Sequence, residues 1–363
     1  MNRRQEHPLF PQLFSRDASF PDPIFYSMQS GLMLCSAVHT AVRLDLATHL
    51  KTPKSLAVLA SETQTHAPSL YLLLRALAAS DIFIEQEEAT HTFAHTQRSR
   101  LLIPDEVGSQ AALVRLWGAG YQWDAWQHLL HTIQTGKPAL EVCYGDGTTI
   151  WSHLIANPQE MEGFQRGLTD VSNLVIPAIL ATYDFSSLRH IVDVGGGYGN
   201  LAVTLLRTYP TLHATLFDRA SIIEQVRRDF SSALPEDIVS RYYLAAGDFF
   251  EAIPSGADCY ILKNVLRDWS DEEYVQILRQ CRRAIGEHAG RILVIESVIS
   301  EDSTFTKFFT LQMAMMMRAA RHRTLEEHQA LFASAGFRLM HAFPLGLEQL
   351  LFEGTPSTAP GEE

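Results

Sequence analysis

IVDVGGGYGN, residues 191–200, is the stretch that decides the fold of this 363-residue chain. Its apolar start predicts a strand over residues 190–194, and a helix is expected to begin near Asn200. The glycines between them allow a sharp turn and a close approach of the backbone to a ligand. In a doubly wound sheet, a nucleotide-like ligand lies in the crevice at the carboxyl ends of the strands. The stretch therefore predicts a strand, a ligand-binding turn and a helix.

Alternating strands and helices are predicted around this stretch, from residue 186 onward. The runs that predict strands are LRHIVDV, TLHATLFD, RYYLAAGDFF, ADCYILKNV and RILVIESVI. The patterns that predict helices between and after them are NLAVTLLRTY, SDEEYVQILRQCRRAIG and TLEEHQALFASAG. This order is typical of a parallel sheet with helices on both faces. Two final runs, FRLMHAFPL and EQLLFEG, predict a hairpin, so we expect the sheet to end in an antiparallel strand.

The N-terminal half predicts a separate helical domain, because 363 residues with 46% hydrophobic content exceed one ordinary core. Apolar residues recur at spacings of three and four over residues 23–50, which predicts a helix. Two short helices and a polar two-strand wing are expected to follow, up to residue 96. This shape is typical of DNA-binding domains, but the second helix is rich in Leu and carries one Arg, which favours packing. Residues 111–180 predict further helices whose aromatic residues suit a core or an apolar pocket.

Charge and composition exclude several classes of function. The net charge is −12 and no basic block stands out, so no nucleic-acid partner is expected. No apolar run reaches the ~18 residues of a membrane span, and the N-terminus lacks the pattern of a signal peptide. The four cysteines lie far apart, and no metal-ligand spacing appears. We therefore expect a cytoplasmic protein with reduced thiols, no membrane partner and no metal.

Acidic side chains at three successive strand ends indicate the ligand. Asp193 stands just before the glycines, where a carboxylate suits an ammonium group rather than a pyrophosphate, and Asn200 breaks the dinucleotide pattern. Asp218 ends the second strand, where a carboxylate can accept ribose hydroxyls. Asp248 and Phe249 are expected to end the third strand and suit an adenine. S-adenosylmethionine (SAM) carries all three groups, although three helix N-caps are the alternative explanation.

Taken together, these segments resemble the small-molecule O-methyltransferase family that includes caffeate-type and bacterial antibiotic-tailoring enzymes. The resemblance covers nearly the whole chain and rests on DVGGGYGN, GDFF, LKNVLRDWSDEE, RILVIESVI and RHRT. It implies an α/β fold of the class I methyltransferase type, with a doubly wound seven-stranded sheet whose last strand is antiparallel. It also implies an N-terminal winged-helix-like dimerisation domain and an intertwined homodimer, in which residues 20–35 of one chain help close the partner's pocket.

The residue patterns and the resemblance together predict the division of the chain and its cofactor contacts. The expected parts are an irregular segment (1–22), the dimerisation domain (23–110), a helical substrate-pocket connector (111–180), the SAM-binding domain (181–353) and a disordered tail (354–363). The expected SAM contacts are Asp193, Gly195, Gly197, Asp218, Asp248, Phe249, Lys263 and Ser172. Asp193 and Gly197 enter this set from the glycine stretch itself, and the others from the family motifs.

Arg267 departs from the family pattern, which has at this position the His that takes the proton of the substrate hydroxyl. An Arg cannot act as a general base because its pKa exceeds about 12, but a fixed cation stabilises an anion. This favours an acidic substrate such as a carboxylate, an enol or an activated phenol. His322 replaces the Glu that orients the family His, whereas Glu296 and Asp268 match the family. The alternative for Arg267 is that it points to solvent or pairs with Asp268.

Three functions are compatible with these residues, and methyl transfer to an acidic hydroxyl or carboxyl of a secondary metabolite is favoured. Arg267 would then hold the oxyanion, with His322 or Asp268 relaying a proton. The second is a pericyclase that keeps SAM without transferring its methyl group, with His128 or His131 as an acid. The third is a non-catalytic SAM-binding partner. The expected substrate contacts, which ordinary packing would also explain, are His131, Phe164, Met313 and Met317.

Overall fold

The computed structural model describes residues 24–87, 89–104, 106–229 and 234–357. The expected N-terminal segment 1–22 and the final residues 358–363 of the expected tail lie outside these ranges. The chain divides into two compact units. One comprises Met1–Gly120 with Arg166–Asp170, and the other comprises Tyr121–Gln165 with Val171–Glu363. The helical connector expected over 111–180 is therefore shared between the two units.

The first unit is helical and includes a small sheet with the strand order β1-β3-β2. Its elements are α1 (Ile24–Arg43), α2 (Leu46–His49), β1 (Lys54–Ser55), α3 (Leu56–Glu62), α4 (Ala67–Ala79), β2 (Phe83–Glu87), β3 (Thr92–His95), α5 (Gln97–Arg100) and α6 (Ala111–Trp117). The two short helices and the wing are thus present. Leu70, Leu74 and Leu77 bury one face of α4 in the core of this unit, so the Leu-rich helix packs as expected.

The helix expected over residues 23–50 is wrong in one respect, because it is interrupted near its end. α1 ends at Arg43, and Asp45 takes a left-handed backbone conformation (φ 49°) before α2 begins. Asp is one of the few residues that visit this region at low cost. Arg115 holds the turn by donating to Asp45 Oδ1 (2.9 Å) and to the Val42 carbonyl (3.3 Å).

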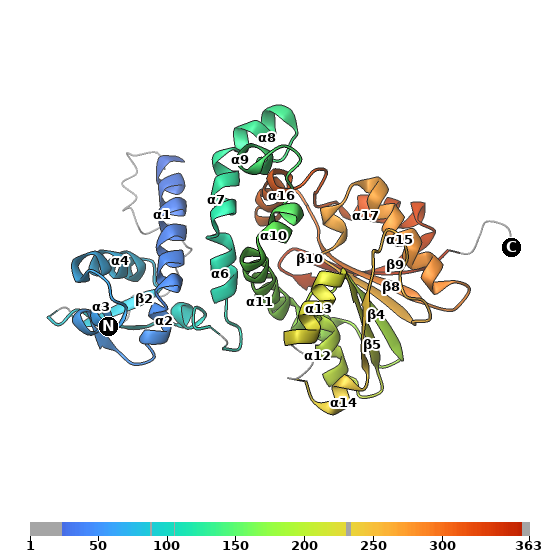
Figure 1. The fold of residues 1–363 in the computed structure, drawn as a ribbon, viewed down its shortest axis with the longest axis horizontal. Helices are drawn as coiled ribbons and strands as arrows, with labels where there is room; N and C mark the ends of the chain where they lie inside the picture. The colour runs from blue at the N-terminus through green and yellow to red at the C-terminus, as the bar shows by residue number, and fades with distance from the viewer. Residues whose placement is uncertain (1–23, 88, 105, 230–233, 358–363) are drawn as a thin grey trace. The chain divides into compact units, whose positions relative to one another are not determined.

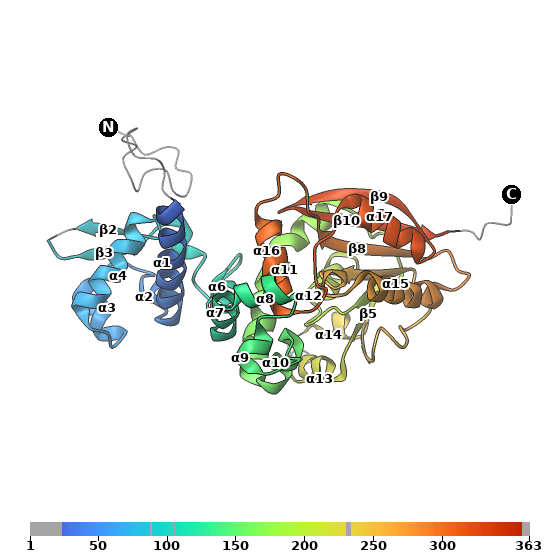
Figure 2. The same ribbon diagram turned by 90° about the horizontal axis from the view of Figure 1, so that it is seen from above.

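A seven-stranded sheet organises the described part of the second unit, with the order β6-β5-β4-β7-β8-β10-β9 (Figures 1 and 2). The strands are β4 (His190–Val194), β5 (His213–Asp218), β6 (Tyr242–Ala246), β7 (Cys259–Lys263), β8 (Arg291–Ser297), β9 (Phe337–Gly346) and β10 (Gln349–Pro356). β10 is antiparallel to both of its neighbours, whereas β4 to β8 are mutually parallel. The last strand of the chain, β10, is therefore antiparallel as expected. It lies between β8 and β9, and β9 forms the edge of the sheet.

Two expected strand ends are corrected by the structure. β10 continues to Pro356 because Gly354 still pairs with Ile292, so the expected tail does not begin at residue 354. β6 ends at Ala246, and Asp248 and Phe249 lie in the turn that follows rather than at the strand end.

Helices cover both faces of the sheet (Figures 1 and 2). Preceding the sheet are α7 (Gly120–Gln127), α8 (Leu129–Thr135), α9 (Leu140–Tyr144), α10 (Ile150–Ala156) and α11 (Pro158–Thr182). Between the strands along the chain come α12 (Asn200–Thr208), α13 (Ala220–Asp229), α14 (Glu236–Val239), α15 (Asp271–Ile285), α16 (Phe305–Met316) and α17 (Leu325–Ser334). Within the described ranges, no helix is long and apolar enough to cross a membrane, and no group of side chains has the make-up of a metal site.

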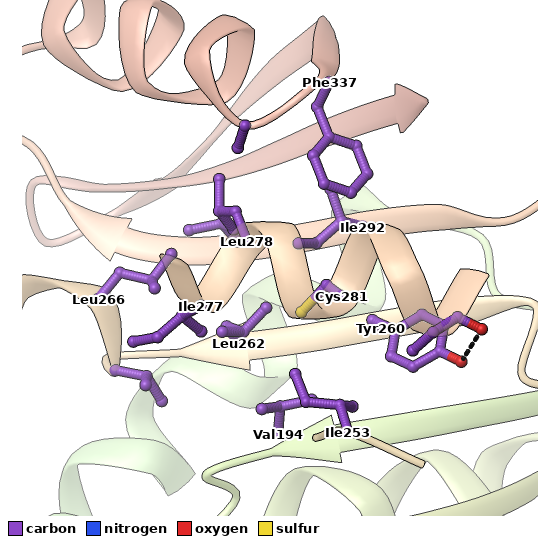
Figure 3. Close-up of a cluster of buried hydrophobic side chains, with 14 of the residues drawn as sticks. Val194, Ile253, Tyr260, Leu262, Leu266, Ile277, Leu278, Cys281, Ile292 and Phe337 are labelled. Atoms are coloured by element: carbon purple, nitrogen blue, oxygen red, sulfur yellow. Dashed lines mark hydrogen bonds between the residues drawn. The ribbon is translucent and has the colours of Figure 1, made fainter. Parts of the chain in front are cut away.

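Side-chain alternation along the strands explains why both faces are apolar. Leu262 of β7 packs with Leu278 and Cys281 of α15 on one face, as Figure 3 shows. The next residue back, Ile261, belongs to a second core on the opposite face, together with residues of α11 and α12. Because both faces are buried, the strands are continuous apolar runs, and their carboxyl ends are where polar side chains gather.

Candidate active site

The glycine turn after β4 has the backbone that its sequence predicts. Gly195 and Gly197 are both left-handed (φ 67° and 59°), a conformation that L-residues with a side chain rarely adopt. A Cβ atom on Gly195 would lie 2.9 Å from Val265, so the glycine lets this turn pack closely against the loop after β7. The Gly197 N–H donates to Asp218 Oδ2 (2.9 Å), and the Arg219 N–H donates to Asp218 Oδ1 (2.7 Å). The turn therefore holds the Asp218 carboxylate in one orientation.

Asp193 is buried directly beneath the glycine turn. A Cβ atom on Gly196 would lie 2.6 Å from Asp193 Oδ2, and within the described part of the chain this oxygen has no hydrogen-bond partner. Burial raises the pKa of Asp193 to about 6, against the opposing effect of Lys263. An unpartnered, buried carboxylate oxygen is unfavourable in the protein alone. The site thus fits a ligand with a positively charged or hydrogen-donating group, such as the ammonium of SAM.

Lys263 and Ser172 are brought together at the end of β7. The Lys263 ammonium donates to Ser172 Oγ on α11 (2.7 Å), although the two residues are far apart in sequence. Burial lowers the pKa of Lys263 to about 8, while the charge of Asp193 acts in the opposite direction. The two residues therefore form a polar pair beside Asp193, which suits the charged methionine end of SAM.

Phe249 and Asp248 lie on the other side of the glycine turn. The Phe249 ring is 3.8 Å from the Cβ position of Gly195 and packs edge-on against Trp269. Asp248 is exposed, and its Oδ1 accepts the Phe250 N–H (2.8 Å). A flat apolar ring beside the glycines and an accessible carboxylate next to it are the features that an adenine requires. Asp248 also stabilises its own turn, but no helix begins there, so it is not a helix N-cap.

The short 3₁₀ turn Leu266–Asp268 follows β7 and carries the residues expected to act on the substrate. Glu296, near the end of β8, accepts the N–H groups of Leu266 (2.8 Å) and Arg267 (3.3 Å) with its Oε1. Its Oε2 is buried and has no partner within the described ranges, and burial raises the pKa of Glu296. The Glu296 side chain therefore holds the backbone of the turn Leu266–Asp268 in place.

Arg267 does not point to solvent. Its Nη1 donates to Asn264 Oδ1 (3.1 Å), and its guanidinium carbon lies 5.1 Å from the centroid of the Phe309 ring. Its Nε lies 4.0 Å from Asp268 Oδ1, which is a loose pairing. The guanidinium is thus a fixed cation held between an amide oxygen, an aromatic face and a carboxylate.

Asp268 is the carboxylate that accompanies this cation. Burial raises the pKa of Asp268 to about 7; the positive charge of Arg267 opposes this shift and the negative charge of Glu296 adds to it. A carboxyl with this pKa exchanges a proton near neutral pH, whereas an ordinary aspartate is fully ionised there. Of the expected catalytic residues, Asp268 is the one whose pKa suits a proton acceptor.

His322 is buried beside the same ring. Its Nδ1 is 2.8 Å from Thr310 Oγ1, and its ring centroid is 5.3 Å from that of Phe309. Burial, together with the charge of Arg267, lowers the pKa of His322 to about 3, so the imidazole is neutral at physiological pH. Its Nε2 has no partner among the described residues. Phe309 therefore contacts both His322 and Arg267, and neutral His322 adds no second charge beside Arg267.

Arg323 is a structural part of this site that the sequence reasoning missed. Its side chain is 1% exposed and donates to the carbonyls of Leu266 (3.1 Å) and Trp269 (2.7 Å), and to Asp271 Oδ1 (2.8 Å). It therefore fixes the turn through its carbonyls, whereas Glu296 holds its N–H groups. The available signal was its position in the RHRT segment, next to His322. Phe309 and Thr310 were missed too, because they act through contacts with residues farther along the chain, and Asn264 was missed although its partner Arg267 is only three residues away.

The residues expected to face the substrate lie on four segments of the second unit. Met313 and Met317 are buried on and directly after α16. His131 lies on α8, which packs against α16, and its Nε2 is buried without a partner in the described part of the chain. Phe164 on α11 packs edge-on against Trp151. The structure thus brings His131 and Met313 onto neighbouring helices.

Two family models match the chain, and both agree with this geometry. A model described as an O-methyltransferase domain matches residues 126–338, and one described as an O-methyltransferase dimerisation domain matches residues 26–105. The first covers the five parallel strands β4 to β8 together with their strand-end residues, and the second covers the first helices and the wing.

Known proteins resemble the chain over nearly its whole length. The mitomycin biosynthesis 6-O-methyltransferase of Streptomyces lavendulae is 33% identical over 87% of this chain and 89% of its own. The aclacinomycin 10-hydroxylase RdmB of Streptomyces purpurascens is 33% identical over 89% of this chain and 86% of its own. The crystal structure of LaPhzM is 31% identical and superposes with a TM-score of 0.83, covering 92% of this chain and 98% of that one.

Proposed function

The chain belongs to the family of SAM-dependent O-methyltransferases of secondary metabolism, and on that premise we propose that it methylates an oxygen that is already acidic. The acceptor would be a hydroxyl or carboxyl of a small metabolite. The observation that carries the proposal is the fixed Arg267 guanidinium at the position where the family pattern has a basic His. A guanidinium cannot take a proton, but it stabilises the oxyanion of an acid that has lost one.

The chain's own side chains would divide this task among them. When bound, SAM supplies an electrophilic methyl group. Arg267, held by Asn264 and Phe309, lowers the free energy of the acceptor oxyanion in a setting from which water is largely excluded. Asp268, with a pKa near neutrality, receives the proton of an acceptor that arrives un-ionised. Glu296 keeps both residues in position through the backbone of their turn.

The residues proposed to hold SAM lie on the glycine turn and around it. Asp193, with its unpartnered oxygen, and the Lys263–Ser172 pair would bind the methionine end. The Asp218 carboxylate, already oriented by two N–H groups, would bind the ribose. The remaining proposed contacts are Gly195, Gly197, Asp248 and Phe249.

The dimerisation domain indicates a homodimer. The finer arrangement is our proposal: the N-terminal helices of two chains intertwine, and residues 20–35 of one chain help close the pocket of its partner. Its support is α1, on which Met28, Leu32 and Met33 are exposed in the single chain. We also propose that His131, Phe164, Met313 and Met317 contact the substrate.

The decisive experiment measures S-adenosylhomocysteine formed from SAM with two acceptors of different acidity. 2-Nitrophenol, acidified by its nitro group, is expected to be methylated, whereas phenol, whose acidity resembles that of tyrosine, is expected to react at least about a hundredfold more slowly at pH 7. Equal rates with the two phenols would contradict the role of Arg267. S-adenosylhomocysteine is the right readout, because one relative is named a hydroxylase. An acceptor that is converted while SAM remains unconsumed would refute methyl transfer.

A further inference from the structure

Two buried glutamines form a pair in the second unit that the proposed reaction does not use. Gln122 lies on α7 and Gln312 on α16, and their side chains are 7% and 3% exposed. The Gln312 Nε2 donates to Gln122 Oε1, so each amide limits the orientation of the other. Neither residue belongs to a family motif quoted above.

The pair leaves one strong acceptor unused. Gln312 Oε1 is buried and has no hydrogen-bond partner among the residues that the structure describes. Buried polar atoms in folded proteins nearly always have a partner, and an isolated one is costly. On the adjacent helix α8, which packs against α16, Thr132 Oγ1 and His131 Nε2 are buried without a partner as well. Unsatisfied polar atoms gathered on two packed helices suggest a place where a ligand supplies the missing bonds.

The position of Gln312 relates this place to Arg267. Phe309, whose ring lies against the Arg267 guanidinium, precedes Gln312 by three residues on α16. Residues three apart on a helix share a face, with Cβ atoms about 5–6 Å apart. Met313 and Met316 extend the same face with buried, flexible apolar side chains. Gln312 therefore starts about one helical turn along α16 from Phe309, the residue whose ring supports Arg267.

We propose that Gln312 Oε1 accepts a hydrogen bond from a second donor on the methyl acceptor, an O–H or N–H group on the opposite side of the ring from the reacting oxygen. This inference rests on the proposed function. It narrows the substrate class to aromatic acids or phenols with two polar ends: one anionic, facing Arg267, and one donating, facing Gln312. The methionines between them would contact the apolar faces of the ring.

The test uses three acceptors that share one acidic hydroxyl. 2-Nitrobenzene-1,4-diol carries a second donor across the ring, 4-methoxy-2-nitrophenol carries a group there that cannot donate, and 2-nitrophenol carries none. With wild-type enzyme, kcat/KM for the diol should exceed that for the methoxy compound about tenfold, which is what one hydrogen bond supplies. Gln312→Met should reduce this preference to within about twofold, while its activity on 2-nitrophenol stays close to that of wild type.

Gln280→Met is the matched control, because Gln280 is a buried glutamine on α15 whose Nε2 donates to the Phe250 carbonyl (2.8 Å). This variant should keep the tenfold preference. Affinities of the three compounds for the S-adenosylhomocysteine complex, measured by calorimetry, separate the inference from the proposed function, since they need no turnover. Equal affinities in wild type, or no binding of the diol, overturn the inference even where methylation occurs. The wild-type comparison also decides the matter if Gln312→Met fails to fold.

Discussion

The Arg267 guanidinium has three neighbours that determine what it can do: the Asn264 amide oxygen, the Phe309 ring and the Asp268 carboxylate. None of them neutralises it closely, because the Asp268 oxygen is 4.0 Å from Arg267 Nε and that carboxyl has a raised pKa. The residues of the site are therefore a cation, Arg267, beside a weak acid, Asp268. The neutral His322 contacts the same Phe309 ring that contacts Arg267. On the proposed function, such a set would favour acceptors that are easily ionised.

Replacing Arg267 with His tests this selection. The family His needs an acidic partner to orient it, and here His322, at the position of that partner, is neutral and bound to Thr310. Arg267→His alone should therefore methylate unactivated phenol no better than wild type, whereas Arg267→His with His322→Glu should gain at least about tenfold. Initial rates of S-adenosylhomocysteine formation measure both variants. Full activity of the single variant on phenol would show that no such coupling exists.

Asp268 should impose a pH dependence on the reaction. Its pKa is about 7, and a carboxyl accepts a proton only when it is ionised, so kcat/KM should rise with pH through about 7 and then level off. For phenol, which stays largely un-ionised between pH 5.5 and 8.5, Asp268→Asn should lower kcat/KM at pH 7 about tenfold or more and remove the levelling above pH 7, because only the small ionised fraction of the phenol then reacts. Rates between pH 5.5 and 8.5 give both profiles. A phenol profile that Asp268→Asn leaves unchanged would exclude Asp268 as the group responsible for the levelling near pH 7.

At the scale of secondary structure, Arg267 and Asp268 both lie on one short turn, Leu266–Asp268. Leu266–Asp268 is too short to be stable alone, and it is held by Glu296 from β8 and by Arg323 from the segment before α17. Arg323 reaches the turn at both ends, through the carbonyls of Leu266 and Trp269. A guanidinium can do this because its donors form a rigid fork, which the point charge of a lysine lacks.

Arg323→Lys should therefore loosen the turn although it preserves the charge. We expect the free energy of unfolding to fall by about 2–3 kcal/mol, because buried carbonyls lose their donors, and kcat to fall as well. Arg321→Lys is the matched control: Arg321 is half-buried, pairs with Asp271 and Glu327, and should lose less than about 1 kcal/mol. Urea unfolding compares the two variants. Equal losses would show that the fork of Arg323 has no special role.

At the scale of the whole molecule, the first unit leaves apolar surface that a single chain does not cover. Met28, Leu32 and Met33 of α1 are 70%, 57% and 56% exposed, whereas residues further along the helix, such as Val42, are buried in the core of the unit. Large apolar side chains exposed together indicate an interaction surface. In a chain with a matched dimerisation domain, a second copy is the expected partner.

Leu32→Glu should therefore weaken the dimer and leave each chain folded. Burying one leucine contributes about 1.5–3 kcal/mol, so the dimer dissociation constant should rise about tenfold or more. Sedimentation velocity over a range of concentrations measures it. Leu347→Glu is the control, because Leu347 is a leucine 67% exposed in the turn between β9 and β10. An unchanged constant for Leu32→Glu would exclude this part of α1 from the interface.

The order of elements in the second unit could be predicted from the sequence, because it depends on local patterns. Buried strands are continuous apolar runs, helices repeat every three to four residues, and glycines mark the turn after β4, so the sheet and its antiparallel last strand were predicted correctly. The end of β6 was misplaced, since Phe249 and Phe250, shortly after Ala246, are apolar as well. The break at Asp45 was missed because Arg115, distant along the chain, stabilises it.

By itself, the sequence determined the fold class, the cofactor family and the unusual presence of an arginine at position 267, because each follows from residues close together in the chain. Only the tertiary structure decided what surrounds that arginine. Phe309 lies against it, His322 nearby is neutral, and Arg323 donates hydrogen bonds to its turn. The amide pair of Gln122 and Gln312 is likewise visible only in the tertiary structure. The physical reason is that burial and long-range contacts determine pKa values, orientations and unsatisfied atoms. Those contacts form only when segments far apart in sequence pack together.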